Sequence, residues 1–165
     1  MERASLSITA EKIKQTLSRR ERRAIRNPQL TPAAVLLPLY QKDGNCHLLF
    51  TKRTEGVAYH KGQICFPGGS CEADDETVEA TALRESFEEI GIGAEDVEIL
   101  GALDDEVTLT TSFVISPIVG SIPYPYQFEV NPIEIDEIIE VPVSALLNKD
   151  NFREEIDPDK DAPSY

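Results

Sequence analysis

The sequence predicts a single domain of the α/β (α+β) class. Its 165 residues, of which 41% are hydrophobic, are enough to bury one core. Segments with the alternation of β-strands are interspersed with segments of helical periodicity. No run of eighteen apolar residues occurs and the N-terminus lacks the apolar region of a secretory signal, so we expect a cytoplasmic protein without a membrane span. Targeting to an organelle by the basic N-terminal segment is the alternative.

The order of the expected elements follows from periodicity and from turn residues. A basic helix is expected over residues 9–26, ended by Asn27 and Pro28. Residues 33–40 and 47–51 predict a hairpin, because Asp43 and Gly44 between them are typical turn residues. The remaining elements are a strand at 63–66, a helix at 76–90 ended by Gly91, strands at 97–103, 113–119 and 137–143, and a short helix at 144–147.

Charge divides the chain into unequal parts. The net charge is −14, but residues 1–27 hold eight Lys/Arg and three Glu, so the rest carries −19. We expect a basic N-terminal helix at 1–27, a folded domain at 28–147 and a polar tail at 148–165. Nucleic-acid binding by the acidic body is not expected. The three cysteines, without a CxxC pair, indicate free thiols and no zinc site.

The most informative segment is residues 68–92, GGSCEADDETVEATALRESFEEIGI. On a helix Glu85, Glu88 and Glu89 fall within one arc, and an apolar face is expected opposite them, made by Leu83, Phe87 and Ile90. Like charges at this spacing repel unless a cation binds them. Mg²⁺ prefers carboxylate oxygens and keeps positions for substrate phosphates. The alternative is a solvated helix face without a metal.

This segment resembles the box of the Nudix hydrolase superfamily, GX5EX7REUXEEXGU. Residues 84–92 match its second half, except that Ser86 stands at an apolar position. Counting forward from Gly69 selects Asp75 as the loop acid, whereas counting back from Arg84 selects Glu76, so a one-residue insertion is expected. The resemblance implies an α/β/α sandwich with a mixed central sheet and a catalytic loop–helix–loop.

Residues 48–69, LLFTKRTEGVAYHKGQICFPGG, resemble the coenzyme A pyrophosphatase branch of this superfamily. Ala58 departs from it, because the branch commonly has arginine there. Residues 131–147 also resemble the branch, whereas nothing after Phe152 does, so a shortened or divergent end is expected. The matching residues are Thr51, Arg53, Thr54, His60, Gly62, Phe66, Pro67, Gly68 and Gly69.

The resemblance implies a metal-dependent hydrolase that splits the pyrophosphate bond of a nucleoside diphosphate derivative, here coenzyme A or an acyl-coenzyme A. Mg²⁺ or Mn²⁺ would bind Glu85, Glu88, Glu89 and the Gly68 carbonyl. Phosphates would face Arg53, His60 and Lys61. Arg84 can brace a carboxylate.

The general base stays open between Glu85, Glu89 and the acidic run Asp104, Asp105 and Glu106, which could fold over the metals or form a solvated turn. Alternatives are another diphosphate such as ADP-ribose, a dinucleoside polyphosphate or an oxidised nucleotide, and a Nudix-like binding module without turnover. Whether the chain forms a homodimer is left open by the sequence.

Overall fold

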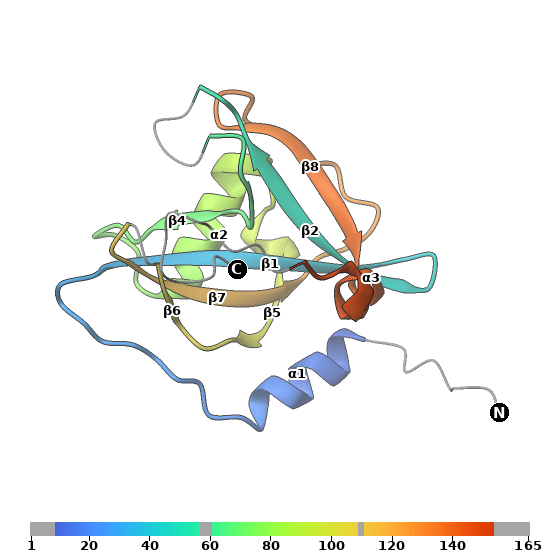
Figure 1. Cartoon of the computed structure of the whole chain (residues 1–165), viewed down its shortest axis with the longest axis horizontal. Coiled ribbons are helices and arrows are strands. Elements are labelled where there is room, and N and C mark those ends of the chain that lie inside the picture. The colour runs from blue at the N-terminus through green and yellow to red at the C-terminus, as the bar shows by residue number, and fades with distance from the viewer. Residues whose placement is uncertain (1–8, 57–60, 109–110, 154–165) are drawn as a thin grey trace.

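A mixed eight-stranded sheet forms the centre of the protein, which a computed structural model describes over residues 9–56, 61–108 and 111–153 (Figure 1). The strands are β1 (Thr31–Lys42), β2 (Asn45–Arg53), β3 (Ile64–Cys65), β4 (Gly68–Ser70), β5 (Glu98–Ala102), β6 (Glu106–Val107), β7 (Phe113–Ser121) and β8 (Ile135–Pro142). The helices are α1 (Ala10–Ser18), α2 (Val78–Ile90) and α3 (Val143–Leu147), with short 3-10 turns η1 (Ala94–Asp96) and η2 (Lys149–Asn151).

The expected hairpin is confirmed as β1 and β2. Asp43 and Gly44 both have positive φ angles, 52° and 75°, as the two-residue turn between twisted strands requires. Lys42 therefore pairs with Asn45 across the turn.

Strand pairing makes the sheet mixed, as expected. β1 is parallel to β7, with Leu36 beside Ile118, while every other pairing is antiparallel. The main path runs β3-β2-β1-β7-β5, and β4, β6 and β8 pair with β1, β7 and β2.

Two hydrophobic clusters cover the two faces of the sheet. Successive side chains of a strand point to opposite faces. Along β1, Ala34 and Leu36 belong to the cluster that contains Ala82 and Ile90 of α2, whereas Leu39 belongs to the cluster against which α1 packs. The sheet is thus enclosed between α2 and α1, which confirms the expected sandwich.

The N-terminal helix is shorter than expected. α1 ends at Ser18, and the segment after it runs beside Asp104 and Asp105. Arg23 and Ile25 donate their backbone N–H groups to these two carboxylates, at 3.0 and 2.8 Å. Because an N–H bonded there is not available to a helical turn, the expectation of helix over 19–26 was wrong.

The apolar face of α2 also differs from the expected one. Phe87 is 62% exposed, while Ser86 is fully buried beside Ala82. None of the helices in the described ranges is long and apolar enough to cross a membrane.

Candidate active site

Two glycines place the backbone of β4 between β1 and α2. A Cβ atom on Gly68 would lie 2.3 Å from the Ala34 carbonyl oxygen, and one on Gly69 would lie 2.5 Å from Oε1 of Glu85. Side chains at either position would collide with these atoms. The double glycine thus brings the loop backbone directly against the first glutamate of the helix.

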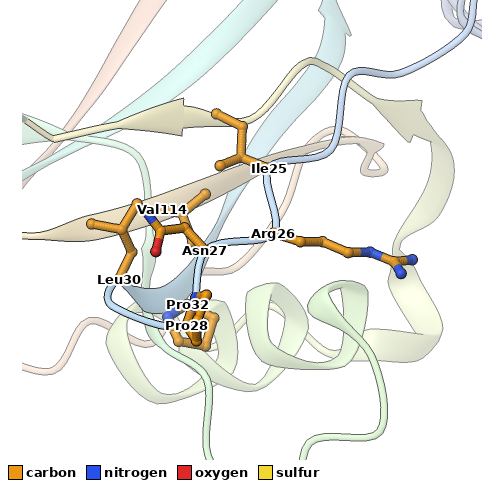
Figure 2. A pocket seen from close by; sticks show the side chains of 7 residues that line it. All are labelled: Ile25, Arg26, Asn27, Pro28, Leu30, Pro32 and Val114. Carbon is orange, nitrogen blue, oxygen red and sulfur yellow. The ribbon is translucent and has the colours of Figure 1, made fainter.

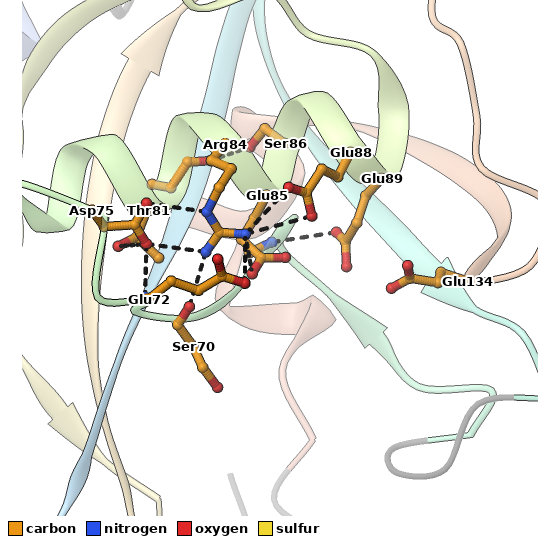
Figure 3. A network of polar contacts seen from close by, with 12 residues as sticks. Ser70, Glu72, Asp75, Thr81, Arg84, Glu85, Ser86, Glu88, Glu89 and Glu134 are labelled. Atoms are coloured by element: carbon orange, nitrogen blue, oxygen red, sulfur yellow. Dashed lines mark hydrogen bonds and ion pairs between the residues drawn. The ribbon is translucent and has the colours of Figure 1, made fainter.

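Helix α2 has a defined start and end. Thr77 caps its N-terminus by accepting a hydrogen bond from the Ala80 N–H, at 3.1 Å. Gly91 ends it in the left-handed conformation with φ of 72°, as expected. With both ends fixed, the side chains of Glu85, Glu88 and Glu89 lie on one side of the helix (Figure 3).

Glu89 is the most buried carboxylate of the site, with 1% of its surface exposed. It accepts hydrogen bonds from Nη1 of Arg53 at 3.1 Å and from the Gly68 N–H at 3.3 Å. Burial raises the pKa of Glu89 to about 7, although Arg53 and the Gly68 N–H act in the opposite direction. A carboxylate in this position needs a positive partner to stay ionised.

Arg84 connects the loop to two of the glutamates. Its guanidinium donates to Asp75, with Nε–Oδ1 of 3.1 Å and Nη2–Oδ2 of 3.0 Å, and to the Ser70 carbonyl at 3.0 Å. Nη1 lies 2.9 Å from Oε1 of Glu85 and 3.4 Å from both oxygens of Glu88. Figure 3 shows the guanidinium in the middle of this network.

The loop acid is Asp75. The Arg84 guanidinium, together with the backbone N–H of Glu72, holds the pKa of the Asp75 carboxyl well below its usual range. Glu76, the alternative, is exposed. The count forward from Gly69 therefore gives the right residue, and the extra residue of this box lies between Asp75 and Arg84.

Carboxylate oxygens are the ligands that a hard divalent cation prefers. Burial raises the pKa of Glu85 as well, and Gly69 leaves room for its carboxylate beside the backbone. Within the described ranges, however, no three acidic, histidine or cysteine side chains already surround one point at metal-binding distance. Glu85 and Glu88 instead share Arg84, and Glu89 contacts Arg53. Guanidinium groups thus hold these carboxylates.

Arg53, expected to bind substrate, lies at the end of β2 where the register with β8 shifts between Lys52 and Arg53. Such irregularities redirect side chains, and Arg53 points to Glu89. Lys61 is exposed and makes no contact with the glutamates in the described part of the chain. His60 lies outside the described residues, as does Ala58.

A fourth carboxylate, not singled out from the sequence, faces the helix. Oε2 of Glu134 lies 3.9 Å from Nη2 of Arg53, and Figure 3 shows it on the side of Glu89. Its loop is bound to α2, because Asn131 donates its N–H to the Glu89 carbonyl at 2.8 Å. In the sequence, residues 131–147 carry only a resemblance, and acidic residues follow one another so closely there that spacing does not distinguish Glu134.

The acidic run after β5 is held elsewhere. Asp105 is buried and pairs with Arg22, while Asp104 pairs with Arg20 at 2.6 Å. Asp104 and Asp105 therefore do not fold over the glutamate helix. Glu106 is exposed on β6, opposite Ile115 of β7.

An open hollow of about 510 Å³ lies at the start of β1 (Figure 2). None of its lining residues belongs to the box, so this hollow is separate from the glutamates. Its lining consists of Ile25, Arg26, Asn27, Pro28, Leu30, Pro32 and Val114.

Comparison with known sequences identifies relatives of this chain. It is 41% identical over 119 residues to Nudix hydrolase 3 of Caenorhabditis elegans, covering 70% of this chain and 49% of that protein. Identity to the Uncharacterized Nudix hydrolase NudL of Enterobacter sp. (strain 638) is 38%, covering 73% and 62%. Identity to the peroxisomal coenzyme A diphosphatase NUDT7 of Mus musculus is 34%, covering 70% and 48%. The chain thus spans about half to three fifths of these relatives.

Solved structures share the fold. A C. elegans Ap4A hydrolase binary complex superposes with a TM-score of 0.59 at 16% identity, covering 72% of this chain and 84% of that one. A MutT protein from Methanosarcina mazei Go1 superposes with a TM-score of 0.54 at 22% identity, covering 78% and 83%. The NUDIX domain family model matches residues 30–159. With Asp75, Arg84 and the three glutamates arranged as described, the chain belongs to the Nudix family.

Proposed function

We propose that this protein is a Mg²⁺- or Mn²⁺-dependent hydrolase of the pyrophosphate bond in a nucleoside diphosphate derivative. The observation that carries the proposal is the buried carboxylate of Glu89, with Glu85 beside it, next to the backbone of Gly68 and Gly69. An acidic surface needs a cation to accept an anionic diphosphate.

The metal would be held by Glu85, Glu88 and Glu89, with the Gly68 carbonyl as a further ligand. When bound, it would neutralise the diphosphate, acidify a water molecule and stabilise charge on the leaving phosphate. Arg84 positions Glu85 and Glu88. Arg53 and Lys61, with His60, would contact the phosphates.

The reaction that we propose forms a bond between a water oxygen and one phosphorus and breaks the P–O bond to the bridging oxygen. The water proton passes to a carboxylate, and the leaving phosphate departs with the electron pair of the broken bond. Glu85 and Glu89 are better placed to accept this proton than Glu106, because both belong to the site. Glu106 instead follows Asp104 and Asp105, which form ion pairs with the N-terminal segment.

For the substrate, we propose coenzyme A or an acyl-coenzyme A, cleaved to 3',5'-ADP and (acyl-)4'-phosphopantetheine. Support comes from the match of residues 48–69 to the coenzyme A pyrophosphatase branch and from the relative named as a coenzyme A diphosphatase. ADP-ribose, dinucleoside polyphosphates and oxidised nucleotides are the competing substrates, and Ala58 favours keeping them in the comparison.

A substrate panel tests this proposal. Coenzyme A, an acyl-coenzyme A and the competing diphosphates are each incubated with Mg²⁺ or Mn²⁺ in ¹⁸O-labelled water, and products are identified by mass spectrometry. We expect 3',5'-ADP from coenzyme A and label on one phosphate only. If only one of the competing diphosphates is cleaved, that compound replaces coenzyme A as the proposed substrate. If no diphosphate is cleaved, the chain is a binding module instead. If Glu88→Gln is as active as wild type on every diphosphate, the proposed metal mechanism is wrong.

A further inference from the structure

Arg53 lies between two carboxylates that it binds unequally. Its Nη1 donates to Glu89 at 3.1 Å, whereas its Nη2 is 3.9 Å from Glu134, beyond hydrogen-bond distance. The Nε–H of Arg53 is buried and has no hydrogen-bond partner among the described residues. A guanidinium with an unused buried donor and a second carboxylate nearby is not in a fully satisfied structural position.

The neighbours of Arg53 are more firmly fixed than its guanidinium. Thr54 donates its N–H to the Glu134 carbonyl at 2.8 Å, and Asn131 Nδ2 donates to Oε1 of Glu134 at 3.3 Å. Glu89 is held by α2 and by the Gly68 N–H. Movement of the guanidinium by about 1 Å would turn the 3.9 Å approach to Glu134 into a hydrogen bond.

A divalent cation and a guanidinium cannot share Glu89 without repulsion. Both bind carboxylate oxygens, and two positive charges a few ångströms apart repel strongly in a site shielded from water. An ionised Glu89 without either partner would be a buried unpaired charge, which is also unfavourable. Oε1 of Glu89 accepts from Arg53 and Oε2 accepts from the Gly68 N–H, so a metal ion that binds Oε1 takes the place of the guanidinium there.

We propose that Arg53 is the internal counter-ion of Glu89 and exchanges with the metal, moving to Glu134 when the ion binds. This inference rests on the proposed function, because it requires a metal at Glu89. In the displaced position Nη1 of Arg53, released from Glu89, is available for an anionic substrate. Arg53 is thus a positioning residue that occupies Oε1 of Glu89 until the metal arrives.

A double-mutant cycle tests the exchange. Mn²⁺ affinity is measured by titration, following the free ion by electron paramagnetic resonance, at mildly alkaline pH so that protons do not compete for the carboxylates. The variants are Arg53→Gln, Glu134→Gln and the double variant. Circular dichroism checks that each variant is folded.

We expect roughly tenfold tighter Mn²⁺ binding in Arg53→Gln, the order of effect for removing a charge-assisted hydrogen bond from the competing state. Glu134→Gln should bind Mn²⁺ several-fold more weakly, because Arg53 then has no second carboxylate. In the Arg53→Gln background, Glu134→Gln should weaken Mn²⁺ binding no more than the charge-matched control Asp136→Asn does.

Two controls remove the same charges outside the site. Lys52→Gln removes a positive charge from the adjacent position of β2, and Asp136→Asn removes a negative charge two residues after Glu134; these two residues pair at 3.1 Å and are partly exposed. Each should change Mn²⁺ affinity much less than the corresponding site variant.

The possible outcomes are distinct. Unchanged or weaker Mn²⁺ binding in Arg53→Gln would overturn the exchange. An equal loss from Glu134→Gln in both backgrounds would also overturn it and make Glu134 a direct ligand. Absence of Mn²⁺ binding by the folded wild-type protein would overturn the metal step of the proposed function itself, and the exchange with it.

Discussion

Asp75 accepts two hydrogen bonds from Arg84, one from Nε at 3.1 Å and one from Nη2 at 3.0 Å. The remaining nitrogen, Nη1, is directed to Glu85 at 2.9 Å. Asp75 therefore sets the orientation of the guanidinium that holds Glu85.

Substitution of Asp75 by Asn should lower kcat by about ten- to a hundredfold, the range for a misplaced catalytic group. The change in KM should be smaller, because Asp75 acts through Arg84, to which it is bound. Glu76→Gln is the matched control, since Glu76 is exposed, and Asp75→Glu should restore part of the activity. Steady-state kinetics on the substrate found in the panel provides the measurement; equal losses in Asp75→Asn and Glu76→Gln would contradict this assignment.

Metal binding should raise the free energy of unfolding of the protein. At a Mn²⁺ concentration a hundred times the dissociation constant, a ligand that binds only the folded state adds about 2.7 kcal/mol to the free energy of unfolding. Thermal unfolding should therefore shift upward with Mn²⁺ and return on chelation.

Glu85→Gln should reduce this shift, because the variant removes a ligand. Asp74→Asn, an exposed position of the same loop, should keep it. A shift that is the same in all three proteins would assign the Mn²⁺ effect to a different site.

The departure of the box at Ser86 gives a packing prediction. The Ser86 hydroxyl is fully buried and donates to the Ala82 carbonyl at 2.7 Å. Replacement by Leu, the type of residue usual at this box position, should destabilise the protein by about 1–3 kcal/mol through overpacking. The free energy of unfolding of Ser86→Ala should stay within about 1 kcal/mol of wild type. Ala removes the hydroxyl together with its hydrogen bond to Ala82, so no side-chain polar group is left unpaired.

Urea unfolding measures these differences. Phe87→Ser is the control at the neighbouring position, and it should change the free energy of unfolding by no more than about 0.5 kcal/mol, because Phe87 is 62% exposed. A stabilising Ser86→Leu would show that the helix is not tightly packed here.

Local sequence signals predicted the parts of this fold that depend on local chemistry. The turn at Asp43 and Gly44, the cap at Gly91 and the run from Arg84 to Glu89 all lie within a few residues of what they determine. The prediction of the buried face of α2 was wrong at Phe87, because the helix approaches the sheet through the small residues Ala82 and Ser86. Hydrophobicity alone does not identify a face whose packing needs small side chains.

Long-range contacts explain the other differences. Arg22 and Asp105 are far apart in the sequence, and nothing near Arg22 indicates that residues 19–26 leave the helix to reach it. The approach of Glu134 to Arg53 likewise follows only from the pairing of β8 with β2. Periodicity carries no information on either contact.

The buried pair of Arg22 and Asp105 predicts a dependence of stability on pH. Burial alone would raise the pKa of Asp105, but hydrogen bonds from Arg22, the Ile25 N–H and Ser116 outweigh it and lower that pKa. A carboxyl whose pKa is lower in the folded state stabilises the protein above its unfolded pKa of about 3.9. This contribution is lost as the pH falls below that value and through the folded pKa.

Asp105→Asn should lower the free energy of unfolding at neutral pH by about 1–3 kcal/mol, because Arg22 loses its charged partner. The deficit should shrink below about pH 4, where Asp105 becomes protonated first in the unfolded state and then, through its lowered pKa, in the folded state. Urea unfolding at neutral and acidic pH measures both values, with Asp43→Asn as the control, since Asp43 is exposed in the hairpin turn and Asn tolerates its positive φ. A deficit that stays constant with pH would mean that the charge of Asp105 does not hold the N-terminal segment on the sheet.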